Sequence, residues 1–163
     1  MSIITAVFRS LPVTVLFGAG FATVTSAPDP GQIAAKAEVA SGRYEMTGTG
    51  ECVHSADVTI FEKPAAMWHA TVTHPSNPLS QVIVTLWQPQ GSSRMEVSLS
   101  LQAALNEYDL STVEGAEIRG SAVARVEPRG AGATLLIDGR TGSGHPITVS
   151  VACPAFGEPE ANG

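Results

Sequence analysis

The two cysteines, Cys52 and Cys153, are the residues whose chemistry the sequence defines best. The chain has no Cys-x-x-Cys pair and no second cysteine cluster, so a redox-active dithiol and a thiolate metal site are both weaker readings. Cys52 shares its position in a period-2 alternation with Tyr44 and Met46, and Cys153 shares its position with Val149. Both sulfurs should therefore point into a core. The sequence predicts one structural disulfide that closes a loop of about 100 residues.

The four histidines, His54, His69, His74 and His145, are scattered along the chain and none has a metal-ligand spacing. His69 and His74 are an odd number of residues apart, so on a regular strand they face opposite sides. A sandwich rim could still gather His54, His74 and Asp57 into a site for copper or zinc. These three residues are weak candidates for metal ligands, and the favoured interpretation is that they are ordinary surface or turn residues. We expect no metal site and no resident cofactor.

Catalytic motifs give little support to an enzyme. The chain contains neither Gly-x-Ser-x-Gly nor His-Glu-x-x-His. Asp138, Ser143 and His145 have the residue types of a triad, but they share one Gly-rich hairpin, where adjacent side chains rarely converge. Glu107 and Asp109 share a strand face and could hold calcium, although a solvated acidic face is the simpler reading. We expect a non-catalytic protein with no catalytic residues.

The clearest functional hint is apolar. In the segment Gln81–Gln88, Ile83 and Trp87 lie on the face opposite to Val82, Val84 and Leu86, and on other strands Leu136 and Val123 also have outward positions. These four outward residues either pack beneath other parts of the chain or form a binding patch for a partner. Both interpretations are open from the sequence, and packing is favoured.

The first 27 residues read as a leader. Arg9 is their only ionisable side chain, the run Leu11–Val24 is apolar, and the small residue Ala27 precedes a Pro-Asp-Pro-Gly turn. This pattern predicts a secretory signal peptide cleaved near Ala27. An uncleaved membrane anchor is the alternative. Either way the chain is exported, and we expect a secreted or periplasmic protein that is free of the membrane once the leader is removed.

Residues 43–154 alternate apolar and polar positions in about nine short segments separated by turn residues, which is typical of half-buried strands. Short links favour antiparallel pairing, because parallel crossovers need a dozen or more residues. We therefore expect an all-β domain, an antiparallel β-sandwich or flattened barrel. Residues 28–42 read as a linker with a helical turn near Ile33–Glu38, and residues 155–163 as a flexible tail. Within the first strand, Gly48 and Gly50 either leave a vacancy for which Trp68 is the candidate filler or mark a bend or bulge of the strand before Cys52.

The charge balance excludes two functional classes. The chain is acidic, with a formal net charge of −6, so neither nucleic acid nor an anionic membrane surface is an expected partner. The function that remains is a non-catalytic binding or interaction module. The alternative is a small-ligand or metal-binding sandwich protein. The sequence does not identify the protein or small molecule that is bound, nor the oligomeric state.

Overall fold

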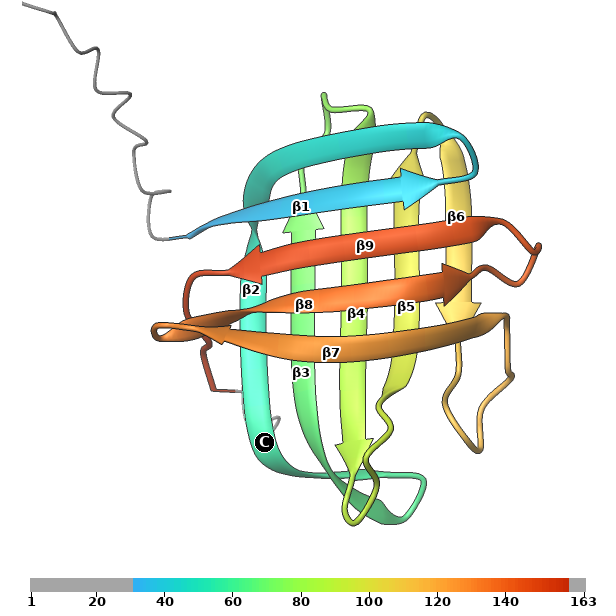
Figure 1. The fold of residues 1–163 in the computed structure, drawn as a ribbon. Helices are drawn as coiled ribbons and strands as arrows, with labels where there is room; N and C mark the ends of the chain where they lie inside the picture. The colour runs from blue at the N-terminus through green and yellow to red at the C-terminus, as the bar shows by residue number, and fades with distance from the viewer. Residues whose placement is uncertain (1–30, 159–163) are drawn as a thin grey trace, which may run out of the picture.

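The computed structural model describes residues 31–158, which form nine antiparallel strands and no helix (Figure 1). All nine belong to one curled, half-barrel sheet in the order β6-β5-β4-β3-β2-β1-β9-β8-β7. The predicted all-β class and the antiparallel pairing are confirmed, and the architecture is a single sheet folded onto itself. No helix in this range is long and apolar enough to cross a membrane. The strands are β1 (Gln32–Val39), β2 (Gly42–Ile60), β3 (Lys63–Thr73), β4 (Leu79–Pro89), β5 (Glu96–Ala103), β6 (Asn106–Ser111), β7 (Ser121–Arg129), β8 (Gly132–Arg140) and β9 (Pro146–Cys153).

The sheet turns its corner along β2, the longest strand. The N-terminal half of β2 pairs with β1 and its C-terminal half pairs with β3, with Thr49 near the change of partner. At this corner a Cβ on Gly48 would collide with the carbonyl oxygen of Thr73, and one on Gly50 would collide with that of Thr71. Glycine is therefore required because the backbones approach closely. The expectation that Trp68 fills this space is wrong, since the β3 backbone occupies it.

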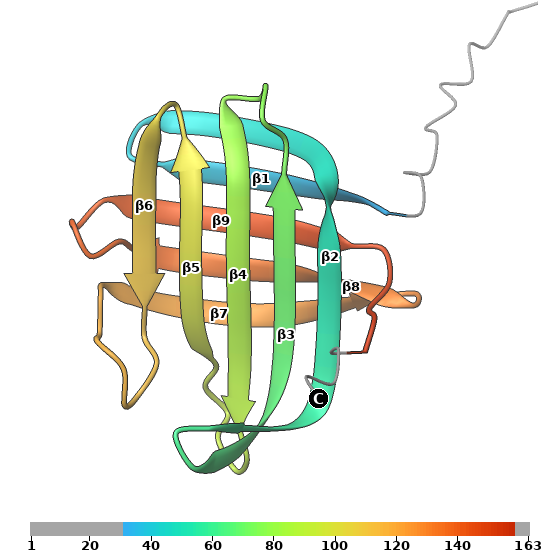
Figure 2. The same cartoon turned by 180° about the vertical axis from the view of Figure 1, so that it is seen from behind.

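The corner divides the sheet into two layers that cross over a shared core (Figures 1 and 2). One layer contains β7, β8, β9, β1 and the start of β2, and the other contains the rest of β2 with β3 to β6. Alternation sends one face of every strand into the space between them. The inward set on β4, namely Val82, Val84 and Leu86, is fully buried, and from the opposite layer Leu135 and Ile137 of β8 are also buried.

The strand β1 corrects the reading of residues 28–42 as a linker with a helical turn. Gln32–Val39 is a strand between β2 and β9, and its alternate residues are almost completely buried. The inward set contains two alanines, and the outward set a third. Alanine is a weak strand former, so the period-2 pattern was hidden. Pairing on both sides with neighbouring strands overrides that local preference.

Two strand limits also differ from expectation. The segment near Val58 and Ile60, expected as a separate strand, continues β2 after an irregular register between Ser55 and Val58. The strand expected from Ile118 begins at Ser121, because Gly120 has a left-handed φ of 90°. The expected leader, residues 1–27, lies outside the described residues, as do residues 159–163 of the expected tail.

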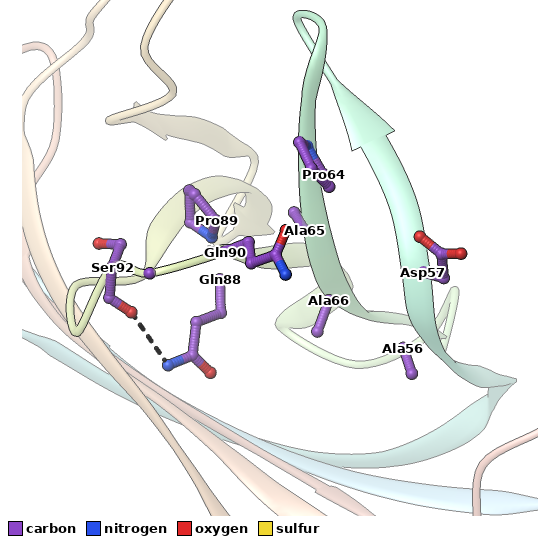
Figure 3. Close-up of a pocket in the computed structure, with 10 residues that line it drawn as sticks. Ala56, Asp57, Pro64, Ala65, Ala66, Gln88, Pro89, Gln90 and Ser92 are labelled. Carbon is purple, nitrogen blue, oxygen red and sulfur yellow. Dashed lines mark hydrogen bonds between the residues drawn. The ribbon is translucent and has the colours of Figure 1, made fainter.

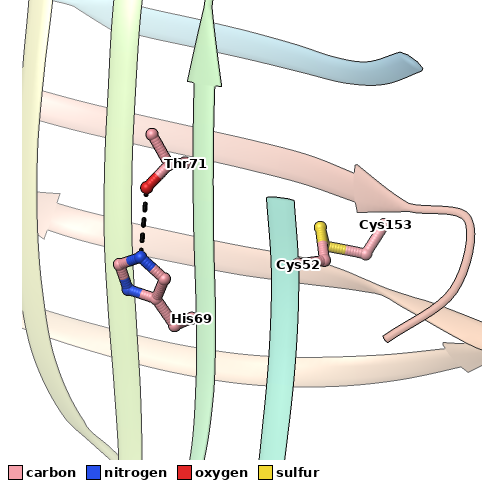
Figure 4. Close-up of a disulfide and its surroundings, with 4 residues drawn as sticks. All are labelled: Cys52, His69, Thr71 and Cys153. Carbon is pink, nitrogen blue, oxygen red and sulfur yellow. Dashed lines mark hydrogen bonds between the residues drawn. A yellow bond between two sulfur atoms is a disulfide. The ribbon is translucent and has the colours of Figure 1, made fainter. Parts of the chain in front are cut away.

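The predicted disulfide is present and buried (Figure 4). The Cα atoms of Cys52 and Cys153 are 5.9 Å apart, and the bond joins β2 to β9, between which β1 lies in the sheet. The chain then turns back, so that the Gly157 N–H donates to the carbonyl of Cys52 at 2.8 Å and the His54 N–H donates to the carbonyl of Gly157 at 3.2 Å. A buried disulfide in this fold favours an oxidising location, extracellular or periplasmic.

Candidate binding groove along strand β7

The half-barrel has two edge strands, and they are treated differently. The edge of β6 is covered, because Ser111 and Arg119 exchange two backbone hydrogen bonds of 2.8 Å and the Gly142 N–H donates to the carbonyl of Asp109 at 3.1 Å. Strand β7 pairs with β8 on one side only. Within residues 31–158, no backbone partner joins β7 on its other side. The open edge of the sheet is therefore β7.

The hairpin between β7 and β8 determines which backbone groups of β7 point away from β8. A two-residue turn follows Arg129, so Arg129 and Gly132 form the hydrogen-bonded pair that closes the hairpin. Pro128, which has no N–H, falls at the next position, where the backbone points away from β8. Positions whose backbone bonds to β8 alternate with positions whose backbone points away from it. The N–H and C=O groups that face outward from the sheet edge therefore belong to Ala122, Ala124 and Val126.

Beside this edge, the strands of the other layer extend beyond β7 and form a ledge (Figures 1 and 2). Trp68 of β3, Gln88 of β4 and Met95 just before β5 line the ledge. With Ala124 and Val126 of β7 they enclose a hollow of about 440 Å³, and Phe156 borders one end. We call this hollow and its continuation along β7 the β7 groove. Trp68, Phe156, Ala124 and Val126 are partly buried and form part of the rim of the main core.

An aromatic stack holds the Trp68 end of the groove in place. The His54 and Trp68 rings are stacked with centroids 4.7 Å apart and an interplanar angle of 12°, and the Phe156 ring meets His54 edge-on at 5.9 Å. The His54 Nδ1 donates a 2.8 Å hydrogen bond to the Met67 carbonyl. The His54 ring therefore packs against the Trp68 ring and helps to fix its orientation.

The groove continues toward the start of β7, where its lining includes both charged and apolar side chains. Two further hollows, of about 480 and 460 Å³, lie along this part of β7, and both include Ser121 and Arg94. Arg140 lines the first of these, and Glu96 lines the second. Charged side chains therefore line the β7 groove at both ends, with Arg94 and Glu96 near the start of β7 and Arg125 near Trp68.

The four residues proposed as an apolar patch do not lie together. Ile83 and Trp87 are on the outer face of β4, whereas Leu136 and Val123 are on the outer face of the opposite layer. Of the two interpretations of Trp87, the structure supports packing. Its side chain is partly buried against a small second core of Ile60, Ala65 and Val113, with Val58.

The weak metal candidates are not assembled into a site. His54 is committed to Trp68 and Met67, and Asp57 lies in the irregular part of β2. His74 follows the far end of β3, where its Nδ1 is buried and has no hydrogen-bond partner among residues 31–158. From residue 31 to residue 158, no group of three His, Cys, Asp or Glu side chains is arranged to hold a metal ion.

The triad residues are also separated in their contacts. Asp138 accepts a hydrogen bond from the Thr148 hydroxyl, Ser143 bonds to the Thr141 hydroxyl, and His145 lies edge-on to Tyr108. None of the three hydrogen-bonds to another within the described part of the chain.

A smaller hollow of about 300 Å³ lies beyond the ledge (Figure 3). It is lined largely by Ala, Pro and Gly residues together with Asp57, Gln88 and Gln90. The Gln88 amide donates to the carbonyl of Ser92 at 3.3 Å, which ties the end of β4 to the following loop. This hollow lacks aromatic side chains and a free strand edge, so the β7 groove is the stronger candidate site.

His69 lies on the outer face of the ledge layer, away from the groove. Its ring nitrogens lie 2.9 Å from the Thr85 hydroxyl and 3.0 Å from the Thr71 hydroxyl, and Figure 4 shows the second of these bonds. Burial lowers the pKa of His69, and the charge of Glu51 opposes that effect. The histidine is therefore favoured in its neutral form.

Sequence reasoning placed Trp68 inward but did not make it part of a site, and it assigned Phe156 to the tail. A signal was available for each. A tryptophan close to the start of an alternating strand lies near the edge of the core, and a lone phenylalanine soon after a cysteine needs somewhere to pack. No sequence pattern predicted that the edge of β7 is open, because alternation does not give the order of the strands in a sheet.

Comparison with known proteins adds no assignment: no protein-family model matches the chain, and no curated protein and no solved structure matches it significantly.

Proposed function

We propose that this protein is an exported, non-catalytic interaction module that binds an extended polypeptide segment as a tenth strand on β7. The observation that carries the proposal is the juxtaposition of the unpaired β7 edge with the partly apolar ledge beside it. Strand addition needs both features: main-chain groups to pair with, and pockets for alternate side chains.

The alternation of a bound strand fits the two sides of the groove. A segment paired with Ala122, Ala124 and Val126 would direct every second side chain onto the ledge, toward Trp68 and Met95. The intervening side chains would face solvent beside Val123, which is 76% exposed. A segment with alternating apolar and polar residues therefore complements the site.

The ledge also selects against another folded sheet. A second copy pairing through its own β7 would bring its own second layer to the space beneath that strand, and the ledge already occupies this space (Figure 1). A single extended segment has no second layer and avoids the collision. The occupant is therefore a strand from an unfolded or extended part of a partner.

The proposal is tested by selecting binders from a displayed library of random nine-residue peptides. We expect the selected sequences to alternate apolar and polar residues. Ala124→Pro should weaken their binding about tenfold or more, because it removes an outward N–H and places a ring at the edge. The matched control, Ala124→Ser, keeps the N–H and the small size and should bind as the parent does.

Two outcomes would overturn the proposal. The first is a selection whose binders are equally tight to the parent and to folded Ala124→Pro. The second is a failure to select any peptide while an anilinonaphthalene dye still binds both proteins, with quenching of Trp68 fluorescence in a Trp87→Phe background. The second result would favour a small apolar ligand, since the hollow at Trp68 has a volume within the range of such sites.

A further inference from the structure

We infer that Pro128 limits the segment bound on β7 to about seven paired residues, opposite Ser121 to Glu127, and that this segment runs antiparallel to β7 with its N-terminal end at Pro128. The inference rests on the proposed function and specifies the kind of partner. A site of this length takes a short extended motif in place of a long strand.

The outward backbone donors of β7 stop at Pro128. In the register of the hairpin, Pro128 lies opposite Ala133, next to the closing pair of Arg129 and Gly132. Its backbone nitrogen therefore faces the open edge of the sheet, where proline has no N–H and carries a ring carbon instead. A partner strand that reaches Pro128 lacks a donor there and meets the ring.

The side-chain cover of β7 decreases toward the same residue. On the face that points toward the ledge, Ala122 is buried, Ala124 and Val126 are partly buried, and Pro128 is exposed. The ledge therefore covers little of the strand beyond Val126. A segment extended past this point would gain neither a backbone donor nor a covering surface for its side chains.

The start of β7 is limited by a change in the direction of the chain. Gly120 has a φ of 90°, and a Cβ there would collide with the carbonyl oxygen of Arg140. Immediately before Gly120, Arg119 pairs with Ser111 at the edge of β6. Figures 1 and 2 show that this connection leaves the line of β7 on the side of its free edge. A bound strand therefore has no straight backbone to pair with before Ser121.

Between these two limits the edge has a defined capacity. Ala122, Ala124 and Val126 each offer one N–H donor and one C=O acceptor to a partner strand. Pairing with all three residues requires a segment opposite Ser121 to Glu127, which is seven of the nine residues of β7. A longer segment should gain no further main-chain hydrogen bonds of this kind.

Antiparallel addition is favoured over parallel addition at this edge. Antiparallel hydrogen bonds run perpendicular to the strands, whereas parallel bonds are slanted and the pairing is slightly less stable per residue. Every strand pair of the existing sheet is antiparallel. An antiparallel segment runs from the Glu127 end toward Ser121, so its N-terminal residues lie beside Pro128. The two ends of a bound peptide can therefore be distinguished by experiment.

The test starts from the shortest part of a selected peptide that keeps full affinity for the parent protein, which we expect to be about seven residues long. A valine and a threonine are then added at its N-terminus or at its C-terminus. On the parent, neither addition should change the dissociation constant by more than about twofold. On Pro128→Ala, which restores the N–H, the N-terminal addition should strengthen binding about three- to tenfold, and the C-terminal addition should still have no effect.

Two further variants separate the role of the N–H from other effects of removing a proline. Pro64→Ala is the control, because Pro64 is an exposed proline in β3 that does not line the β7 groove, and this variant should bind every peptide as the parent does. Pro128→Val restores the same N–H with a branched side chain and should reproduce the gain seen with Pro128→Ala. Circular dichroism checks the folding of each variant.

Three results would overturn the inference while leaving strand addition intact. The N-terminal addition could strengthen binding equally on the parent and on Pro128→Ala, or it could strengthen binding on neither Pro128 variant. The gain could also follow the C-terminal addition, which would mean that the segment runs parallel to β7. Failure of strand addition itself would instead appear as insensitivity to Ala124→Pro.

Discussion

At the scale of single residues, His69 links burial to the pH dependence of stability. Its two ring nitrogens are held by threonine hydroxyls, and burial lowers its pKa from the ordinary 6.5. A histidine whose pKa is lower in the folded state binds protons more readily when unfolded. The contribution of neutral His69 to the free energy of unfolding is therefore complete above pH 6.5. It is lost as the pH falls from 6.5 through the lowered pKa of His69 in the folded protein.

We expect the free energy of unfolding, measured in urea, to decrease between pH 7.5 and pH 5 in part because of His69. His69→Gln keeps a hydrogen-bonding side chain that does not titrate in this range, so the decrease should become smaller. His145→Gln is the matched control, because His145 is exposed. An unchanged pH dependence in His69→Gln, or an equal change in both variants, would show that the threonine bonds tolerate the charged ring.

At the scale of elements, strand β7 shows how much alternation predicts. The outward assignment of Val123 is confirmed by its exposure of 76%, and its neighbour Ala122, on the opposite face of the strand, is 4% exposed. Cys52 and Cys153 were placed inward by the same reasoning, and they form the disulfide. The inward or outward direction of a side chain can be predicted because successive side chains of a half-buried strand point alternately into the core and into water.

What alternation could not predict was which strands are neighbours. Strand β1 was missed because alanines weaken its pattern, and its place between β2 and β9 depends on pairing with residues far along the chain. The open edge at β7, and therefore the candidate groove, is a consequence of that order. For the same reason the outward residues Ile83 and Val123 were grouped although they lie on opposite layers.

The two faces of β7 can be tested with a single type of substitution. Ala122→Arg places a cation in the core without a partner, so we expect the free energy of unfolding to fall by roughly 3 kcal/mol or more. Val123→Arg leaves the cation in water and should change stability by about 0.5 kcal/mol or less. Urea unfolding of both variants is the measurement. Equal effects would mean that β7 is covered on both faces.

At the scale of the whole molecule, the half-barrel is closed on one side and open on the other. The corner of β2, the disulfide and the returning segment at Gly157 join the two layers on the closed side. On the open side, no strand of the described chain connects β7 to the ledge beside it. The asymmetry leaves the groove accessible while the closed side fixes the distance between its two walls.

The disulfide should therefore contribute to stability mainly by restricting the unfolded chain. Its half-cystines are 101 residues apart, and for a loop of this size the chain-entropy model gives about 4.7 kcal/mol before any cost in the native state. We expect the double variant Cys52→Ser, Cys153→Ser to lose a few kcal/mol in urea unfolding. Its denaturant slope should rise, because the unfolded state without the cross-link exposes more surface.

The same variant also tests whether the disulfide stabilises the closed side of the half-barrel more than the open side. Phe156 follows Cys153 closely, and Gly157 is bonded to the backbone of Cys52 and His54. Without the disulfide, amide hydrogen exchange should increase first at His54 and Gly157, while the amides of Ala122 and Ala124, which already face outward, should change least. Uniformly faster exchange would show that the cross-link stabilises the molecule as one unit, and an unchanged unfolding free energy would contradict its stabilising role.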